Sequence, residues 1–197
     1  NPLHAAWMQA AEAAGYPLTR DVNGRQQEGF GRMDMTVGEG RRWSAANAYL
    51  KPAMKRANLT VLTHAQVLRV EFEGKRAVGV RYVRGGQEVL AKARAEVILA
   101  GGAINSPQIL KLSGVGPAEE LTRFGLPVVC DRPGVGENLQ DHLEFYFQIA
   151  SKKPVTLYSS MNPIAKALIG ARWILFKDGL GATNHFESCG FIRSRAG

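Results

Sequence analysis

The side chains best suited to chemistry lie in one short stretch, Asp141 to Phe147, where an imidazole, a carboxylate and aromatic rings alternate. If the stretch is a β-strand, a side-chain period of two places His142, Glu144 and Tyr146 on one face. A carboxylate among aromatic rings is costly to bury without a partner. A cationic ligand would be such a partner, and each aromatic face would add about 0.5–2 kcal/mol of cation–π attraction. The stretch therefore predicts that Glu144 binds a cation, with His142 and Tyr146 on the same face.

Two other interpretations of this stretch stay open. An edge strand would leave the Glu144 carboxylate in water or paired with an arginine. Glu187, in the stretch Asn184 to Arg193, is a rival carboxylate for the same cation.

A second candidate site is the Gly101-Gly102 pair, which follows an apolar run over residues 96–100. Continuous apolarity predicts a strand that is buried on both faces, as in a parallel sheet. Ser106-Pro107 predicts the start of a helix, with serine as the N-cap and proline in the first turn. A strand, two glycines and a helix N-terminus direct backbone N–H groups toward a phosphate. A plain strand-to-helix turn is the alternative.

Several classes of site are not indicated by the sequence. Five Gly-x-Gly pairs occur, but none continues to the GxGxxG pattern of dinucleotide-binding loops, so such a loop is expected outside these residues. The two cysteines, Cys130 and Cys189, form no CxxC pair, and no metal site is predicted. The net charge of +8 comes from isolated basic pairs, which favour solvated faces over nucleic-acid binding. Weak attraction to an anionic membrane surface is the alternative explanation of that charge.

The elements that must position these sites form a mixed α/β fold. The periodicity predicts an antiparallel meander over 67–72, 77–83 and 88–93, with turns at Gly74-Lys75 and Gly85-Gly86. Residues 19–42 are predicted to be a long irregular connection. The other predicted helices cover 2–15, 44–56, 117–124 and 164–176, and the other predicted strands cover 59–63, 126–129, 143–150 and 186–192.

Four ordered stretches carry a resemblance to a known family. The most specific is Gly102-Ala-Ile-Asn-Ser-Pro-Gln-Ile-Leu-Lys-Leu-Ser-Gly-Val-Gly116, which fixes glycines, Ser-Pro and apolar positions. The others are Gly40-Arg-Arg-Trp-Ser-Ala-Ala-Asn-Ala-Tyr-Leu50, Asn58-Leu-Thr-Val-Leu-Thr-His-Ala-Gln-Val67 and Pro133-Gly-Val-Gly-Glu-Asn-Leu-Gln-Asp-His142. Together they resemble the glucose-methanol-choline (GMC) family of FAD-dependent alcohol oxidoreductases.

The resemblance implies a fold and a cofactor. The fold would combine part of a Rossmann-like FAD-binding domain with part of a substrate domain built on an antiparallel sheet. Residues 1–40 would be a connection on the substrate side, 41–140 part of the FAD-binding domain, and 141–197 the start of the substrate domain. Ala100, Gly101 and Gly102 would lie against FAD, and the backbone of Val67 would meet the adenine.

The resemblance also implies that the chain is a central fragment of a longer enzyme. The catalytic histidine is expected after Gly197, so none of His4, His64, His142 and His185 is assigned as the base. Residues 1–197 alone are accordingly expected to be inactive.

The choline-oxidising members are the most similar part of the family, on the stretches Asn1 to Trp7, Gln27 to Gly31 and Asn184 to Arg193. They imply oxidation of choline to betaine aldehyde for glycine betaine synthesis. In these members the acidic residue two places after Asp-His contacts the trimethylammonium group, which is Glu144 here, and His142 would line the cavity near the flavin.

Several aspects of this implied function stay open. The substrate could be another alcohol, and the electron acceptor could be oxygen or a membrane quinone. The expected location is the cytoplasm, or peripherally at the inner membrane, and the sequence gives no oligomeric state. A nicotinamide-dependent dehydrogenase and a non-catalytic basic binding module are the alternatives from other classes.

Overall fold

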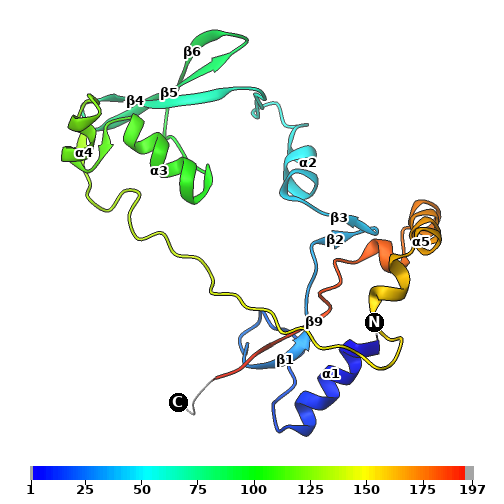
Figure 1. Cartoon of the computed structure of the whole chain (residues 1–197). Helices are drawn as coiled ribbons and strands as arrows, with labels where there is room; N and C mark the ends of the chain where they lie inside the picture. Colours follow the sequence, from blue (N-terminus) through cyan, green and yellow to red (C-terminus); the bar gives the residue numbers. More distant parts are fainter. Residues whose placement is uncertain (1, 194–197) are drawn as a thin grey trace. The chain divides into compact units, whose positions relative to one another are not determined.

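The computed structural model describes residues 2–193, and its contacts divide the chain into two units. One unit is contiguous and runs from Thr60 to Tyr146, whereas the other combines the residues up to Leu59 with those from Phe147 onward. Both contain helices and antiparallel strands, so the predicted mixed fold is confirmed (Figure 1). No helix among residues 2–193 is long and apolar enough to span a bilayer.

The contiguous unit is organised by the predicted three-stranded meander, which the structure confirms. The strands lie in the order β4-β5-β6, and each neighbouring pair is antiparallel. Gly85 and Gly86 form the second turn with positive φ angles of 58° and 79°, a conformation that favours glycine. The bounds are Gln66–Glu73 for β4, Arg76–Arg84 for β5 and Gln87–Lys92 for β6.

Helix α3, Gly102–Leu112, packs against the edge strand β4. Ser113, which is 4% exposed, follows this helix and links its end to the strand by hydrogen bonds. Its hydroxyl accepts a hydrogen bond from the Val70 N–H at 2.8 Å and donates one to the Ile109 carbonyl at 2.5 Å. One side chain thus satisfies a backbone N–H at the outer edge of β4.

We expect Ser113→Ala to lower the free energy of unfolding by about 1–3 kcal/mol, because the buried Val70 N–H would lose its acceptor. Thermal and urea unfolding of the intact protein would measure this loss. Thr122→Ala is the matched control, since its exposed hydroxyl donates only to the Ala118 carbonyl, and it should change stability by no more than about 0.5 kcal/mol. Equal losses in the two variants would contradict a special role for Ser113.

The part of this unit that comes after α3 in the sequence contains two short strands and a helix. Strand β7, Val115–Gly116, pairs in parallel with β8, Cys130–Asp131, and α4, Ala118–Arg123, lies between them in the sequence. Leu121 of α4 is 1% exposed. The helix predicted over 117–124 is confirmed.

The second unit contains a short antiparallel pair of strands. Strand β1, Gly29–Arg32, pairs with β9, Ser188–Phe191, and α1, Pro2–Ala13, packs nearby. The ring of Phe30 lies 4.8 Å from that of Trp7 and 5.3 Å from that of Tyr16, measured between centroids. These rings form a small aromatic core.

A long-range contact joins two other parts of this unit. Strand β2, Val37–Gly38, forms a hairpin with β3, Arg41–Arg42. This hairpin contacts helix α5, Pro163–Phe176. The Trp173 indole N–H donates to the Gly40 carbonyl at 2.6 Å. The short 3-10 helices η2, Leu157–Met161, and η3, Gly179–Ala182, flank α5.

The helix predicted to start at Ser44 is present but shorter. It consists of a π-helical turn, η1, Ala46–Leu50, and α2, Lys51–Ala53. The Ser44 carbonyl accepts from the Ala48 N–H at 2.8 Å.

Several predicted elements are absent from the described residues. The strands expected over 59–63, 96–100, 126–129 and 143–150 have no regular secondary structure, and the connection over 19–42 contains β1, β2 and β3. A strand is stable only when another strand satisfies its backbone groups. Ile98 is 77% exposed and Leu143 is 90% exposed, so neither run is buried by the described part of the chain.

Candidate functional site

Two of the four predicted cofactor residues meet at a cavity of about 650 Å³ between β4 and α3. Val67 and Gly101, which are 34 positions apart in the sequence, both line it. Ala100 directly precedes Gly101 and is exposed. The full lining is Gln66, Val67, Leu68, Arg69, Gly101, Asn105, Gln108, Ile109, Leu112 and Leu126.

The Gly-Gly turn begins α3 five residues before the predicted N-cap. Gly101 is the N-cap and its N–H donates to the Ser106 hydroxyl at 3.0 Å, so Ser106 and Pro107 lie inside the helix. The predicted N-cap position is therefore wrong, because the Ser106 hydroxyl stabilises the turn from within the helix.

The local geometry favours glycine at both positions. A Cβ at Gly101 would lie 3.1 Å from the Cβ of Asn105, and Gly102 has a φ of 86°. No acidic residue occupies the first turn of α3. The turn therefore allows the close approach of a ligand, and the helix dipole favours an anionic group there.

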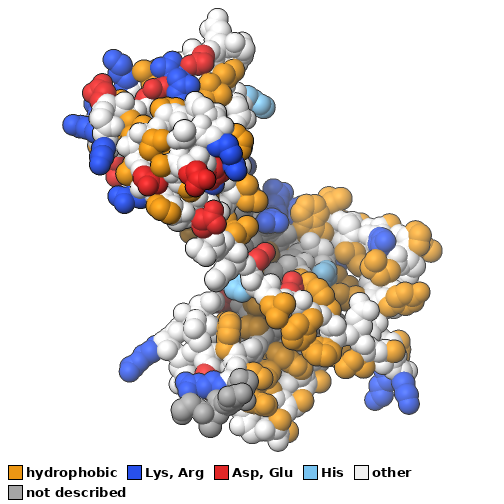
Figure 2. Space-filling view, turned by 60° about the vertical axis from the view of Figure 1, so that its left-hand side comes forward, with side chains coloured by type: hydrophobic (Ala, Val, Ile, Leu, Met, Phe, Trp, Pro, Cys, Tyr) orange, Lys and Arg blue, Asp and Glu red, His pale blue; other side chains and the backbone are white. Residues whose placement is uncertain are grey.

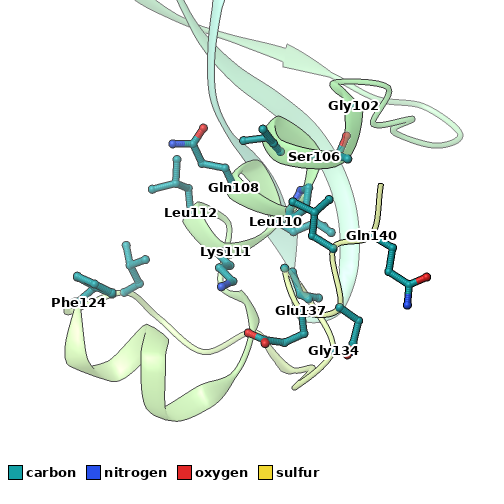
Figure 3. A pocket seen from close by; sticks show the side chains of 18 residues that line it. Gly102, Ser106, Gln108, Leu110, Lys111, Leu112, Phe124, Gly134, Glu137 and Gln140 are labelled. Atoms are coloured by element: carbon teal, nitrogen blue, oxygen red, sulfur yellow. The ribbon is translucent and has the colours of Figure 1, made fainter. Parts of the chain in front are cut away.

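A larger cavity of about 1050 Å³ lies between α3 and the residues 134–140 (Figure 3). Gly102 belongs to its lining, as do Lys111 and Glu137. Lys111 Nζ donates to both carboxylate oxygens of Glu120, at 2.9 and 2.7 Å. A Cβ at Gly136 would lie 3.0 Å from Lys111 Nζ, so the backbone at Gly136 packs closely on this lysine.

Sequence reasoning missed this ion pair. The eight residues between Lys111 and Glu120 include the end of α3 and the strand β7, so no helical spacing marks the two residues as partners.

The predicted cation site has a different backbone from the one expected. Residues 141–147 are irregular rather than a strand, and His142, Glu144 and Tyr146 are all exposed. The Tyr146 hydroxyl hydrogen-bonds to the Glu144 carboxylate, and this contact raises the pKa of Tyr146. The structure thus brings two of the three residues together, while the His142 N–H bonds to the Asp141 carboxylate at 2.8 Å.

The rival carboxylate, Glu187, lies beside β9 in the other unit. It is half-buried, and its carbonyl accepts from the Met33 N–H at 3.1 Å. Among residues 2–193 no cluster of three or more His, Cys, Asp or Glu side chains could hold a metal ion.

The comparisons with known proteins decide the family. A family model described as GMC oxidoreductase matches residues 1–144. The chain belongs to the GMC oxidoreductase family. The resemblance inferred from the four sequence stretches is thereby confirmed.

Curated members of the GMC family match the whole chain. It is 58% identical to the mitochondrial choline dehydrogenase of Homo sapiens, over 100% of this chain and 33% of that protein. It is 57% identical to the oxygen-dependent choline dehydrogenase of Photobacterium profundum, over 100% of this chain and 35% of that protein. The chain therefore spans about a third of the length of these relatives.

Solved GMC-like structures share the fold. An FAD-dependent oxidoreductase from Chaetomium thermophilum has a TM-score of 0.81 at 29% identity, covering 96% of this chain and 34% of that one. A formate oxidase has a TM-score of 0.84 at 24% identity, covering 98% of this chain and 33% of that one. The second similarity shows the fold alone.

Proposed function

We propose that the intact protein oxidises choline to betaine aldehyde, with FAD as its cofactor. The observation that carries the proposal is the identity of 55–58% to choline dehydrogenases across all 197 residues. The same similarity weighs against a nicotinamide-dependent dehydrogenase and against a non-catalytic binding module. Another alcohol is the remaining alternative substrate.

The residues of the β4–α3 cavity fit FAD. Val67 lies on an edge strand, where backbone groups outside the sheet can pair with the adenine. Gly101 and Gly102 allow close approach of the cofactor at a helix N-terminus that carries no acidic residue. When bound, FAD accepts the hydride from the alcohol carbon. On this basis residues 41–140 belong to the FAD-binding domain and residues from 141 begin the substrate domain.

Choline recognition is proposed for Glu144, with His142 and Tyr146 beside the substrate. A quaternary ammonium group carries a permanent charge but has no N–H to donate, so a site for it needs a carboxylate and aromatic faces. The Glu144 carboxylate raises the pKa of the neighbouring Tyr146, so the two side chains lie close together. We propose that the histidine that accepts the hydroxyl proton lies beyond Gly197.

A structure of the intact protein with FAD tests the cofactor assignment. We expect Val67, Ala100, Gly101 and Gly102 to contact FAD, and the purified protein to show flavin absorbance. A separation of more than a side chain's length between FAD and these residues would contradict the assignment. Turnover of choline compared with a panel of uncharged alcohols tests the substrate.

The electron acceptor is proposed to be oxygen or a membrane quinone. The name of the Photobacterium profundum relative supports oxygen. A quinone would place the enzyme peripherally at a membrane, with the rest of the molecule in the cytoplasm. Turnover with and without oxygen, in the presence of a soluble quinone, separates the two acceptors.

A further inference from the structure

The two edges of the meander differ in what covers them. At the β4 edge, the Val70 N–H donates to the hydroxyl of Ser113, the C-cap of α3. At the other edge, every residue of β6 is exposed, and among residues 2–193 no strand pairs with its outer side (Figure 1). An edge strand presents unpaired N–H and C=O groups that can pair with another chain. The outer edge of β6 is therefore a candidate interaction surface.

The pairing of β6 with β5 shows which backbone groups of β6 are free. The Ala93 N–H, just after β6, donates to the Val78 carbonyl at 2.8 Å, so the backbone of Ala93 faces β5. Backbone groups face alternate sides along a strand of an antiparallel pair. The odd-numbered residues of β6 therefore also face β5. The N–H and C=O groups of the even-numbered residues, Glu88, Leu90 and Lys92, face outward.

The outward-facing residues complement themselves. If two copies of β6 pair antiparallel about a two-fold axis at Leu90, then Leu90 lies opposite its own copy and Glu88 lies opposite Lys92 at both ends. Opposite charges in directly opposed positions stabilise an antiparallel pair, whereas like charges destabilise it. In this register the outward-facing groups of one copy meet those of the other, so each of the three residues would donate and accept a backbone hydrogen bond.

A network of ion pairs already crosses the meander and ends at this edge. Glu71 of β4 pairs with Arg69 at 3.0 Å and with Arg81 of β5, and Arg81 in turn pairs with Glu88 of β6 at 3.1 Å. The Glu88 side chain is still 46% exposed, and Lys92 has no acidic partner among residues 2–193. Acidic and basic side chains are likewise interspersed at the top of the view in Figure 2. A second copy would extend the network through its own Lys92.

We propose that two copies of the intact protein associate through β6, so that their meanders form one continuous sheet across a two-fold axis at Leu90. A second copy fits this edge because the pattern Glu-x-Leu-x-Lys complements itself when reversed. Closed two-fold dimers are also the most common oligomers of soluble proteins. The pairing is short, so we expect a dissociation constant of about 1–100 μM. The assembly requires neither the proposed substrate nor the proposed cofactor.

Sedimentation velocity of the intact protein over this concentration range tests the interface. Glu88→Lys and Lys92→Glu each place like charges opposite each other at both ends of the pairing, so each should weaken dimerisation about tenfold or more. An equimolar mixture of the two variants should associate within about threefold of the unchanged protein, because the lysines of one variant then face the glutamates of the other. The double variant that carries both changes should dimerise by itself for the same reason.

A control variant separates this pairing from a general effect of charge. Lys75→Glu makes the same charge change at an exposed residue of the β4–β5 turn, outside β6. It should dimerise as the unchanged protein does, and circular dichroism should show that all of these variants are folded.

Cross-linking tests the position of the two-fold axis. Leu90→Cys should form a disulfide-linked dimer on mild oxidation, since directly opposed residues of a hydrogen-bonded antiparallel pair have Cα atoms about 5.5 Å apart, within the range of a disulfide. Val89→Cys should form much less, because Val89 lies on the other face of the sheet and away from the axis. The unchanged protein, with its free Cys130 and Cys189, gives the background.

Several results would overturn the proposal. The intact protein could remain monomeric above about 100 μM. Glu88→Lys and Lys92→Glu could dimerise as tightly as Lys75→Glu, or folded samples of the two could fail to associate when they are mixed. A Leu90→Cys variant that resists a water-soluble thiol reagent as a monomer would show that the rest of the protein covers β6.

Discussion

Replacing Glu144 with glutamine should raise the KM for choline on the order of 100-fold. The substitution keeps the shape of the side chain but removes the charge that we propose to face the trimethylammonium group. Removing one partner of a desolvated charge pair costs about 2–5 kcal/mol, and a 100-fold change lies in the lower half of this range, at about 2.7 kcal/mol. Steady-state kinetics of the intact enzyme would measure the change.

An uncharged analogue and a second carboxylate are the controls for this prediction. For 3,3-dimethylbutanol, which has the shape of choline without its charge, the KM should rise less than about threefold in Glu144→Gln. Glu187→Gln removes the rival carboxylate and should leave the KM for choline nearly unchanged. Equal effects of Glu144→Gln on both substrates would show that Glu144 is structural, and a larger effect at Glu187 would transfer the role to that residue.

Replacing Gly101 with valine should lower the affinity for FAD by about tenfold to 100-fold. A Cβ at this position already lies 3.1 Å from the Cβ of Asn105, and Gly101 lines the same cavity as Val67, so valine adds two methyl groups beside that cavity. Overpacking of this kind costs about 1–3 kcal/mol. The ratio of flavin to protein absorbance and a titration of the apoprotein with FAD would measure the loss.

Two variants separate this steric effect from general instability. Gly102→Ala introduces strain of about 1–2 kcal/mol at a φ of 86°, but its Cβ meets no protein atom, so it should reduce stability and lower the affinity for FAD less than Gly101→Val does. Gly170→Val adds the same side chain on α5 with no atom within 4 Å and should change neither. Full retention of FAD by a folded Gly101→Val protein would contradict the cofactor site.

The sequence predicted the elements whose partners are close along the chain. The three strands of the meander are joined by two-residue turns, so their hydrophobic alternation and their glycines identify the pairing directly. The helices around residues 2–15, 117–124 and 164–176 were predicted for a similar reason, since their hydrogen bonds lie within each segment.

Elements that depend on distant partners could not be predicted with the same success. The apolar run over 96–100 has strand composition, but no strand among the described residues pairs with it. Ser106 was recognised as a helix-start residue, but its hydroxyl binds a backbone N–H five positions earlier rather than capping its own turn. The joint lining of one cavity by Val67 and Gly101 depends on the packing of α3 on β4, which spacing alone does not specify.

The contact between Gly40 and Trp173 spans 133 positions, and the one between His4 and Ser188 spans 184. During synthesis, at about 5–20 residues per second, the later partner emerges from the ribosome roughly 7 to 37 s after the earlier one. The three-stranded meander can fold during this interval. The apolar side chains of Trp7 and Phe30, in contrast, stay exposed until β9 has been synthesised. Substitutions that weaken the β1–β9 pairing should therefore reduce the yield of folded protein and increase its dependence on chaperones, while leaving the turnover of the folded fraction unchanged.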